Sequence, residues 1–485
     1  MSPILPVLHI LSKVLMLYAL ALLLPLAISL GLDDGAHRAY DEAILVTFAS
    51  GAALWLFTRR GRRELQTRDG FLLVVLIWAI LPLYSTLPLM QILPELSFTH
   101  AYFEAVSGLT ATGATVLSGL DQLPPSLNVW RTEMHWLGGM GVIVLVVAVL
   151  PMLGVGGRQL FKAETPTPMK DSKLTPRMAE TAKGLWLVYA FITALCIFAL
   201  WAGGMSGIDA LVHAFSVMSL GGFSSHDASM AYFDSVLLEL IVMVFALVAA
   251  ISFSTHFLAF RMKSLAAYRF DAEIPWMLGV LGVCILGLAG YLLMRDVYAD
   301  FFEALRYTAF NTISIATTLG FSTTDFNAWP YFAPLLMLFL SSFIAGSGST
   351  GGGIKMLRAV LLYKQVYREL IKLVHPSATV HTKVGQQAVP NKIIYAILAF
   401  LFIYVASIII LSFILAASGL DVFTAFTAVV AMVNNTGPGL GLVGPASTYA
   451  VLSDFQLWVL SFAMLLGRLE FFTLLVVLTP VFWRK

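Results

Sequence analysis

Charged residues are scarce in this chain of 485 residues: Asp, Glu, Lys and Arg together make up 12%, whereas hydrophobic residues make up 59%. A soluble domain of this size needs more polar side chains to cover its surface, so the composition excludes a soluble protein. Cysteine is nearly absent, and Cys196 and Cys284 each lie in an apolar stretch, where a thiol packs like a small hydrophobic group. The sequence therefore predicts neither a disulfide framework nor a cysteine metal site.

A convergent catalytic set is missing as well. No paired carboxylates or histidine cluster fall at one membrane depth, and the few ionisable residues in apolar stretches, such as Glu239, are scattered. We therefore expect no enzyme activity and no organic cofactor. The net charge of +2 comes from basic residues spread along the chain, not gathered with aromatics into one patch, so nucleic acid is not an expected partner.

Long apolar stretches are what the chain has instead, and ten of them are candidates for the ~20 residues that a spanning helix needs. They cover residues 14–32, 43–57, 70–93, 134–157, 184–208, 235–260, 274–294, 332–344, 393–420 and 455–483. The first stretch lacks the basic start and the cleavage site of a signal peptide, so we expect it to be a retained helix. The sequence predicts an all-α polytopic membrane protein with ten crossings.

The distribution of basic residues gives the orientation, because cytoplasmic loops collect Lys and Arg. With the N-terminus inside, 24 of the 29 basic residues fall in inner segments. The exceptions are Arg38, Arg131, Arg295, Arg306 and Arg468. An even number of crossings also leaves the C-terminus inside, so both termini are expected to be cytoplasmic.

Four glycine-centred polar segments interrupt the apolar pattern, and all four lie towards the outer face in this orientation. They read TATGATV around Gly113, SLGGFSS around Gly222, TTLGFST around Gly320 and NNTGPGL around Gly437. Each follows a short run rich in Ala and Phe, at residues 98–109, 207–218, 299–316 and 420–433, which suits a re-entrant helix. The recurrence predicts one structural unit used four times.

The expected organisation is a lead-in helix hairpin followed by four parallel repeats of helix, pore helix, filter and helix around a pseudo-fourfold pore. The hairpin covers residues 1–65. The repeats cover residues 66–160, 180–265, 270–375 and 388–485, with an intramembrane gating loop in the third.

The glycine segments predict a filter for a monovalent cation. Backbone carbonyls replace the hydration shell of the ion, and glycine lets four chains crowd around one axis. Glycines that only pack helices together are the simpler alternative, but four matches at one place in four units favour a filter. The expected ligands are Ala111, Thr112, Gly113, Leu220, Gly221, Gly222, Thr318, Leu319, Gly320, Asn435, Thr436 and Gly437.

The third repeat contains a further glycine-rich segment, because its apolar run ends after Ile344 and AGSGSTGGG follows. About 13 helical residues span only ~20 Å, so the break lies at membrane depth, where irregular backbone must line a cavity or protein. A phosphate-binding P-loop is excluded because the segment lacks the G-K-[ST] ending. We expect a gate made of Gly346, Ser347, Gly348, Ser349, Thr350, Gly351, Gly352 and Gly353.

Two basic residues accompany this gate. Arg468 lies in the middle of the last apolar stretch, and Glu470 points to another face of that helix. We therefore expect Arg468 to face the pore and bond the carbonyls of the glycine loop. Lys355 directly follows the loop, and either lines the pore or anchors the inner interface.

Three acids follow the first three glycine segments: Asp121, Asp227 and Asp325. They can draw cations into the outer mouth, or they can cap turns and helices. His226 is expected to be structural.

Several longer motifs resemble those of the Trk/Ktr/HKT superfamily of potassium transporters. They are TRDGF at 67–71, HWLGGMGVIVL at 135–145, GGFSSHDAS at 221–229, GSTGGGIK at 348–355 and LGRLEFFTLL at 466–475. The resemblance covers essentially the whole chain. It implies a channel-like potassium uptake subunit of the bacterial inner membrane, surrounded by lipid, usually a homodimer, and regulated by a cytosolic nucleotide-binding partner of the TrkA type.

The resemblance also assigns the gating role to the glycine loop, and the first filter glycine, Gly113, accompanies preference for potassium in that family. Leu220 and Leu319 depart from the family pattern, so a less selective monovalent cation channel stays open. So does a sodium- or proton-coupled secondary transporter, although such proteins usually show inverted halves, whereas these repeats are parallel.

Overall fold

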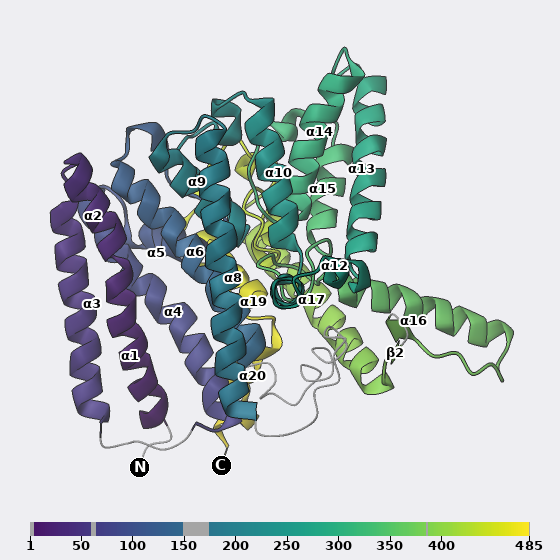
Figure 1. The fold of residues 1–485 in the computed structure, drawn as a ribbon, viewed down its shortest axis with the longest axis horizontal. Coiled ribbons are helices and arrows are strands. Elements are labelled where there is room, and N and C mark those ends of the chain that lie inside the picture. Colours follow the sequence, from purple (N-terminus) through teal and green to yellow (C-terminus); the bar gives the residue numbers. More distant parts are fainter. Residues whose placement is uncertain (1–3, 60–64, 149–173, 385–386, 485) are drawn as a thin grey trace.

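The computed structural model describes residues 4–59, 65–148, 174–384 and 387–484. The chain begins with a helical hairpin, in which α1 (Leu5–Ala21) and α2 (Leu23–Leu32) pack against α3 (His37–Thr58). This hairpin stands at one side of the molecule (Figure 1). It is the expected lead-in element, and it carries no glycine segment.

Four units of three helices follow the hairpin. They are α4 (Thr67–Ile92), α5 (Phe98–Thr110) and α6 (Pro125–Ala148); α8 (Leu174–Ala202), α9 (Gly207–Ser219) and α10 (Val236–Ala250); α13 (Ile274–Met294), α14 (Phe301–Ala316) and α15 (Phe332–Ser341); and α17 (Asn391–Ala417), α18 (Val422–Val433) and α19 (Asp454–Arg468). The short middle helices α5, α9, α14 and α18 coincide with the four runs that the sequence indicated. The expected fold class is confirmed.

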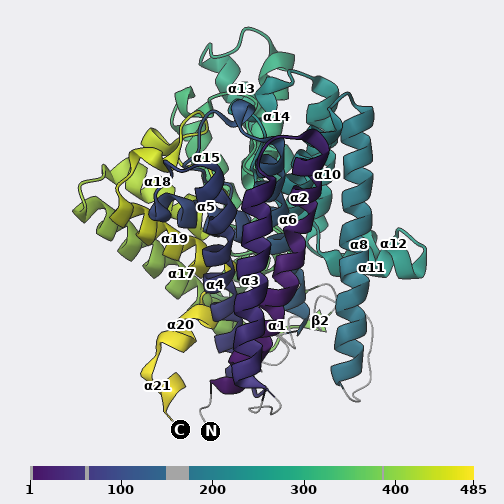
Figure 2. The same ribbon diagram turned by 90° about the vertical axis from the view of Figure 1, so that its left-hand side faces the viewer.

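The remaining described elements are short or lie outside the four units. Among them are five 3-10 turns in the loops between each pore helix and the last helix of its unit: η1 (Leu120–Gln122), η3 (Ser229–Tyr232), η4 (Phe326–Ala328), η5 (Gly441–Val443) and η6 (Tyr449–Val451). The others are α11 (Phe253–Met262), α12 (Ala266–Phe270), α16 (Met356–Val374), β1 (Lys383–Val384), β2 (Gln387–Ala388), α20 (Phe472–Leu478) and α21 (Pro480–Trp483). Helices α11 and α12 project sideways from the body (Figure 2).

All four pore helices begin in the same way, at a side chain that caps the first turn. Ser97, Ser206 and Asp421 each accept a hydrogen bond from the backbone N–H three residues later. Asp300 accepts from Phe302 N and Glu303 N. Such caps satisfy N–H groups that the helix itself leaves unpaired, and therefore set where each pore helix starts.

The four units close into a ring through one repeated contact. The last helix of each unit packs on the pore helix of the next: α6 on α9, α10 on α14, α15 on α18, and α19 back on α5. This cyclic order is the pseudo-fourfold arrangement, with the pore helices at its centre.

The last helices of three units are broken, whereas the sequence indicated a break only in the third. The stretches expected as spans at 235–260 and 455–483 bend by 92° between α10 and α11 and by 117° between α19 and α20. Six described helices are long and apolar enough to span a membrane, or eight if each bent pair counts as one. Helix α15 has only 10 residues, and the stretch at 134–157 runs beyond the described residues, so the count of ten crossings stays a prediction.

Both ends of the chain lie at the same end of the molecule. Val7 of α1, Leu72 of α4, and Val477 and Phe482 near the C-terminus form one apolar cluster. The pore helices start at the opposite end (Figure 1). The domain boundary at residue 160 and most of the basic segment 155–183 lie outside the described residues.

Candidate ion-conduction site

The four pore helices end in one backbone motif. One or two residues after each helix end, a residue with φ between 50 and 69° donates its N–H to the carbonyl three residues back. The N–H of the following residue donates to the carbonyl five residues back. The first set is Ala111, Leu220, Thr318 and Asn435, which bond to the carbonyls of Gly108, Val217, Ile315 and Met432. The second set is Thr112, Gly221, Leu319 and Thr436, which bond to Ser107, Ser216, Ser314 and Ala431 over 2.8 to 2.9 Å. This Schellman pattern stops each helix and turns the chain towards the axis.

The next residue in every unit is the expected filter glycine, and it also has positive φ. The four values are 83° at Gly113, 87° at Gly222, 86° at Gly320 and 92° at Gly437. An L-residue rarely adopts this conformation, so backbone geometry alone favours glycine at each position.

The close packing around these glycines also excludes a side chain, and its pattern shows that the four segments form a closed ring. A Cβ on Gly113 would lie 2.2 Å from the carbonyl oxygen of Gly221, and one on Gly222 2.4 Å from that of Leu319. A Cβ on Gly320 would meet Thr436 O at 2.4 Å, and one on Gly437 would meet Thr112 O at 2.6 Å. Each glycine therefore makes room for a carbonyl of the next unit, in one rotational sense.

The structure thus brings all twelve expected filter residues together. The two leucines that depart from the family pattern place their side chains away from this ring, since Leu220 and Leu319 are fully buried in the apolar core of units two and three. Only their backbone belongs to the ring. Asn435 links the fourth segment to the first, because its Nδ2 donates to Thr112 Oγ1 over 2.9 Å.

Behind the ring, side chains of the pore helices bind the extended segments that follow the four filter glycines, here called the filter strands. The sequence analysis did not foresee these contacts. Three of these side chains stand nine residues before the filter glycine: Glu104, His213 and Asn311. His213 Nε2 lies 3.0 Å from Ser224 Oγ, and Asn311 Oδ1 accepts from Thr323 N over 3.2 Å. The fourth unit has Ala428 there, and the neighbouring Thr427 hydroxyl accepts from Leu440 N over 3.2 Å instead.

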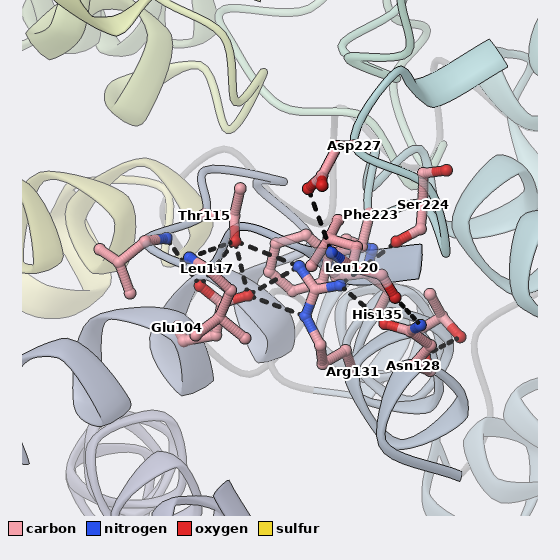
Figure 3. Close-up of polar contacts among 12 residues, drawn as sticks. Glu104, Thr115, Leu117, Leu120, Asn128, Arg131, His135, Phe223, Ser224 and Asp227 are labelled. Carbon is pink, nitrogen blue, oxygen red and sulfur yellow. Dashed lines mark hydrogen bonds and ion pairs between the residues drawn. The ribbon is translucent and has the colours of Figure 1, made fainter. Parts of the chain in front are cut away.

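The first unit carries the only charged member of this set, and it is paired with Arg131 of α6 (Figure 3). The Arg131 Nη2 and Glu104 Oε1 atoms are 2.8 Å apart, and both side chains are fully buried. Glu104 accepts hydrogen bonds from Thr115 Oγ1 and from Val116 N over 3.0 and 2.9 Å. The guanidinium lies 4.3 Å from the ring centre of Phe223.

The glycine loop of the third unit lies under the ends of three pore helices. Thr350 Oγ1 donates to Met218 O over 3.0 Å, and Gly352 N donates to Thr318 Oγ1 over 3.1 Å. A Cβ on Gly352 would lie 1.9 Å from the carbonyl oxygen of Asn434. The loop therefore sits directly inward of the ring, against units two, three and four.

Arg468 bonds a carbonyl of the glycine loop, as the sequence analysis expected. Its Nη1 donates to Thr350 O over 2.7 Å, and its side chain is buried. Glu470 pairs instead with Arg358 of α16, at 2.6 Å. Among the described residues the other two guanidinium nitrogens of Arg468, Nε and Nη2, have no hydrogen-bond partner.

Lys355 is buried and braces the loop from within, because its Nζ donates to the carbonyl of Gly351. Of the two roles left open for it, an anchor at the inner interface does not fit this burial. A second brace was not foreseen: Glu273, just before α13, accepts from Ser347 N over 2.9 Å and from Leu357 N over 3.0 Å. One carboxylate oxygen thus holds both flanks of the loop.

The three outer acids are engaged in capping. Asp227 accepts from Gly119 N and Leu120 N over 2.9 and 3.2 Å, and Asp121 accepts from Asp227 N over 3.2 Å. Asp325 caps η4 by accepting from Asn327 N over 3.1 Å. Of the two roles left open for them, the geometry favours capping: Asp121 and Asp227 join the loops of units one and two, and Asp325 caps a turn within unit three.

His226 completes this outer joint, as a structural residue. Its Nδ1 contacts Asp121 Oδ1, its Nε2 lies 3.3 Å from Asp209 Oδ1, and its ring stacks on Tyr232 at 3.5 Å. Burial alone would lower the pKa of His226, but its contacts with the two carboxylates outweigh burial and raise this pKa above 6.5. Burial would raise the pKa of Asp121, but the bond to His226 brings it below 3.8.

The sequence is similar to those of known proteins over nearly its full length. Residues 37–484 match the family model TrkH, described as cation transport protein. The chain is 46% identical over 482 residues to the Trk system potassium uptake protein TrkH of Halomonas elongata, covering 99% of both chains. It is 43% identical over 479 residues to TrkH of Escherichia coli K12, covering 98% of this chain and 99% of that one.

A solved structure agrees with these sequence matches. The crystal structure of the potassium transporter TrkH from Vibrio parahaemolyticus superposes with a TM-score of 0.92. The two chains are 42% identical, and the match covers 100% of each.

Proposed function

Because the chain belongs to the TrkH family of cation transport proteins, we propose that it is the ion-conducting subunit of a Trk-type potassium uptake system. One observation carries the proposal: the closed ring in which each filter glycine makes room for a carbonyl oxygen of the next unit. Relatives named for potassium uptake match nearly the full chain, which supports potassium as the ion.

The mechanism follows from the ring. A potassium ion sheds its water and is coordinated by backbone carbonyls of the twelve filter residues, which come from four segments of the one chain. The pore helices aim their partly negative C-terminal ends at the space below the ring, so a cation is favoured there before it moves inward. Selectivity then depends on how firmly the carbonyl positions are held.

Inward of the ring, the loop 346–353 acts as the gate. Its contacts with Met218 O and Thr318 Oγ1 keep it across the path, and Lys355 and Arg468 hold it there through backbone carbonyls. The edge of the Arg468 guanidinium that has no hydrogen-bond partner among the described residues adds a positive charge that opposes cation passage. Conduction requires the loop to move aside.

We place the protein in a bacterial inner membrane, as a homodimer with both termini and the basic inner segments in the cytoplasm. The excess of Lys and Arg in these segments supports the orientation, as does the clustering of both chain ends. A TrkA-like cytosolic nucleotide-binding subunit controls the gate, in keeping with the Trk system named for the relatives. We also propose the division of the chain given above, into an N-terminal hairpin and four pore repeats.

Cation flux into liposomes tests the function. Wild-type protein is compared with Gly113→Ser for uptake of potassium, rubidium, sodium and lithium. Gly119→Ser is the matched control, because Gly119 also has positive φ, at 72°, but no atom lies within 4 Å of its Cβ position. The serine at position 113 would displace the Gly221 carbonyl, whereas the control strains only an outer loop.

We expect potassium and rubidium to exceed sodium and lithium in the wild type and in Gly119→Ser, and discrimination to be lost in Gly113→Ser. Equal flux of all four cations in the wild type would instead indicate a less selective channel. Potassium accumulation against its gradient, driven by a sodium or proton gradient, would indicate a coupled transporter. No flux in the wild type or in Arg468→Ala would overturn the proposed function.

A further inference from the structure

The buried ion pair of Glu104 and Arg131 has no role in the conduction and gating steps proposed above. It lies behind the ring at the seam between units one and two, where its groups touch both filter strands (Figure 3). Glu104 comes from pore helix α5, and Arg131 comes from α6, which packs on the pore helix of unit two.

We propose that the Glu104–Arg131 pair is a specificity-determining element, which sets the discrimination between potassium and sodium by fixing the spacing of the first two filter strands. This inference rests on the proposed function, since it assumes that the ring is the filter.

The contacts on the first strand begin two residues after Gly113. Thr115 Oγ1 lies 3.0 Å from both Glu104 oxygens, and Val116 N donates to Glu104 Oε2 over 2.9 Å. Arg131 Nη2 reaches the same Thr115 hydroxyl over 3.2 Å. Bonds to ionised groups are about twice as strong as neutral ones, so this strand is tightly held.

The contacts on the second strand begin one residue after Gly222. Arg131 Nη1 donates to Ser224 O over 3.2 Å, and the guanidinium faces the ring of Phe223. The His135 ring also stacks on Phe223, with the ring centres 4.2 Å apart, and so restricts the movement of the Phe223 ring. A single guanidinium therefore bridges the two strands that flank the Gly113 and Gly221 contact.

The other seams lack such a bridge among the described residues. His213, Asn311 and Thr427 hold the strands after the second, third and fourth filter glycines through neutral groups, each within its own unit. Filter selectivity depends on carbonyl spacing or on the field of the carbonyl dipoles, and both change if one seam loosens. The charged seam is therefore where a small substitution has the greatest effect on ion choice.

A second Glu–Arg pair offers a matched control. Arg306 of α14 donates from Nε and Nη2 to the buried Glu239 of α10, over 3.0 and 2.7 Å. It also joins a pore helix to a membrane helix, yet no described bond links it to residues 318–323 of the filter segment. Removing this pair changes the scaffold without touching the ring.

The experiment measures the permeability ratio of potassium to sodium in liposomes for wild type, Glu104→Gln, Thr115→Val and Glu239→Gln. All are made in an Arg468→Ala background, so that the gate does not limit flux. Glutamine keeps the size of the glutamate and removes its charge, and valine keeps the shape of threonine without its hydroxyl. Thermal unfolding of each purified variant shows whether it is folded.

We expect the ratio to fall severalfold in Glu104→Gln and in Thr115→Val, and to stay at the background value in Glu239→Gln. Thr115→Val carries the test alone if Glu104→Gln does not fold. Unchanged ratios in folded variants, or an equal loss of flux for both ions, would overturn the inference while leaving the filter in place. A background protein that does not discriminate between the ions would overturn the proposed selectivity as well.

Discussion

Arg468 donates a hydrogen bond from its Nη1 atom to the carbonyl oxygen of Thr350, over 2.7 Å. The two residues are far apart in the chain, and the bond joins the end of the last unit to the middle of the intramembrane loop of the third. The Arg468 guanidinium therefore has two proposed effects: it holds the loop in place, and its charge opposes the passage of a potassium ion.

Arg468→Ala is expected to raise cation flux. A hydrogen bond from a charged group contributes about 1.5–3 kcal/mol, and about 1.4 kcal/mol off a barrier is a tenfold rate, so a rise of about tenfold or more is expected. Liposome flux in the absence of any cytosolic partner is the measurement. Arg358→Ala is the control, because that arginine pairs with Glu470 and not with the loop. Unchanged flux in Arg468→Ala would contradict the barrier.

Glu273→Ala is expected to release the loop. The variant loses the acceptor for Ser347 N and Leu357 N, and the second of these belongs to the first turn of α16, where a carboxylate also stabilises the helix end. The measurement is the labelling rate of a cysteine at position 349, where the native Ser349 is almost fully buried. Labelling of Ser349→Cys should be faster when combined with Glu273→Ala.

The control for this experiment is Glu303→Gln, which changes an exposed acid on α14. Its labelling rate is expected to match that of Ser349→Cys alone. Equal labelling in the Glu273→Ala variant would show that the loop does not depend on this carboxylate.

The pore helices were predictable from the sequence because each one carries its own start and stop. A capping side chain opens each, as at Ser206, and a positive-φ turn followed by a glycine closes it, as at Leu220 and Gly222. These are local signals, and they recur four times. The four glycines were predictable because each follows one of these runs in the sequence. Their positive φ and the nearby carbonyl of the next unit, which exclude a side chain, are seen only in the structure.

The bends after α10 and α19 were not predicted. Mainly apolar residues surround the first, and the charged Arg468 and Glu470 at the second do not by themselves specify a turn. At the first bend Phe253 N donates to Gly348 O, a residue of the loop that lies almost a hundred positions away. At the second, Glu470 and Phe471 have φ of 54 and 52° although neither is glycine. Tertiary contacts impose these turns, so no local pattern announces them.

Glu104, Arg131 and Glu273 were missed because their partners are distant in sequence. One signal was present: Arg131 and Arg306 were two of the five basic residues outside the inner segments, and a cation there calls for a carboxylate. Both proved to be paired, with Glu104 and Glu239. The identity of each partner, however, depends on the packing of the units.

Gly352→Ala is expected to push the loop away from the pore helices. Its Cβ would lie 1.9 Å from Asn434 O, a backbone atom that cannot yield easily, and such overpacking costs about 1–3 kcal/mol. Basal flux should rise and the unfolding temperature should fall. Gly282→Ala on α13 is the control, because nothing lies within 4 Å of that Cβ position. Wild-type flux in a folded Gly352→Ala protein would argue against a gate at this loop.

The outer joint around His226 is expected to make stability depend on pH. Its pKa is higher in the folded protein than the ordinary 6.5, so its contribution is complete below about pH 6.5 and is lost as pH rises through the raised value. The pKa of Asp121 is lowered, so its contribution is present above about pH 3.9 and is lost as pH falls through the lower folded value. Asp209 and the ring of His213, 6.3 Å from that of His226, also face this joint.

Thermal unfolding of the purified protein from about pH 6 to about pH 9 measures this contribution. The wild type is expected to lose stability over the range, and His226→Gln is expected to lose less, because glutamine does not titrate. His381→Gln, a change at an exposed histidine near the β-hairpin, should follow the wild type. Parallel curves for wild type and His226→Gln would mean that the imidazole is not charged at the joint, and that Asp121 and Asp227 hold the two outer loops together through backbone N–H groups alone.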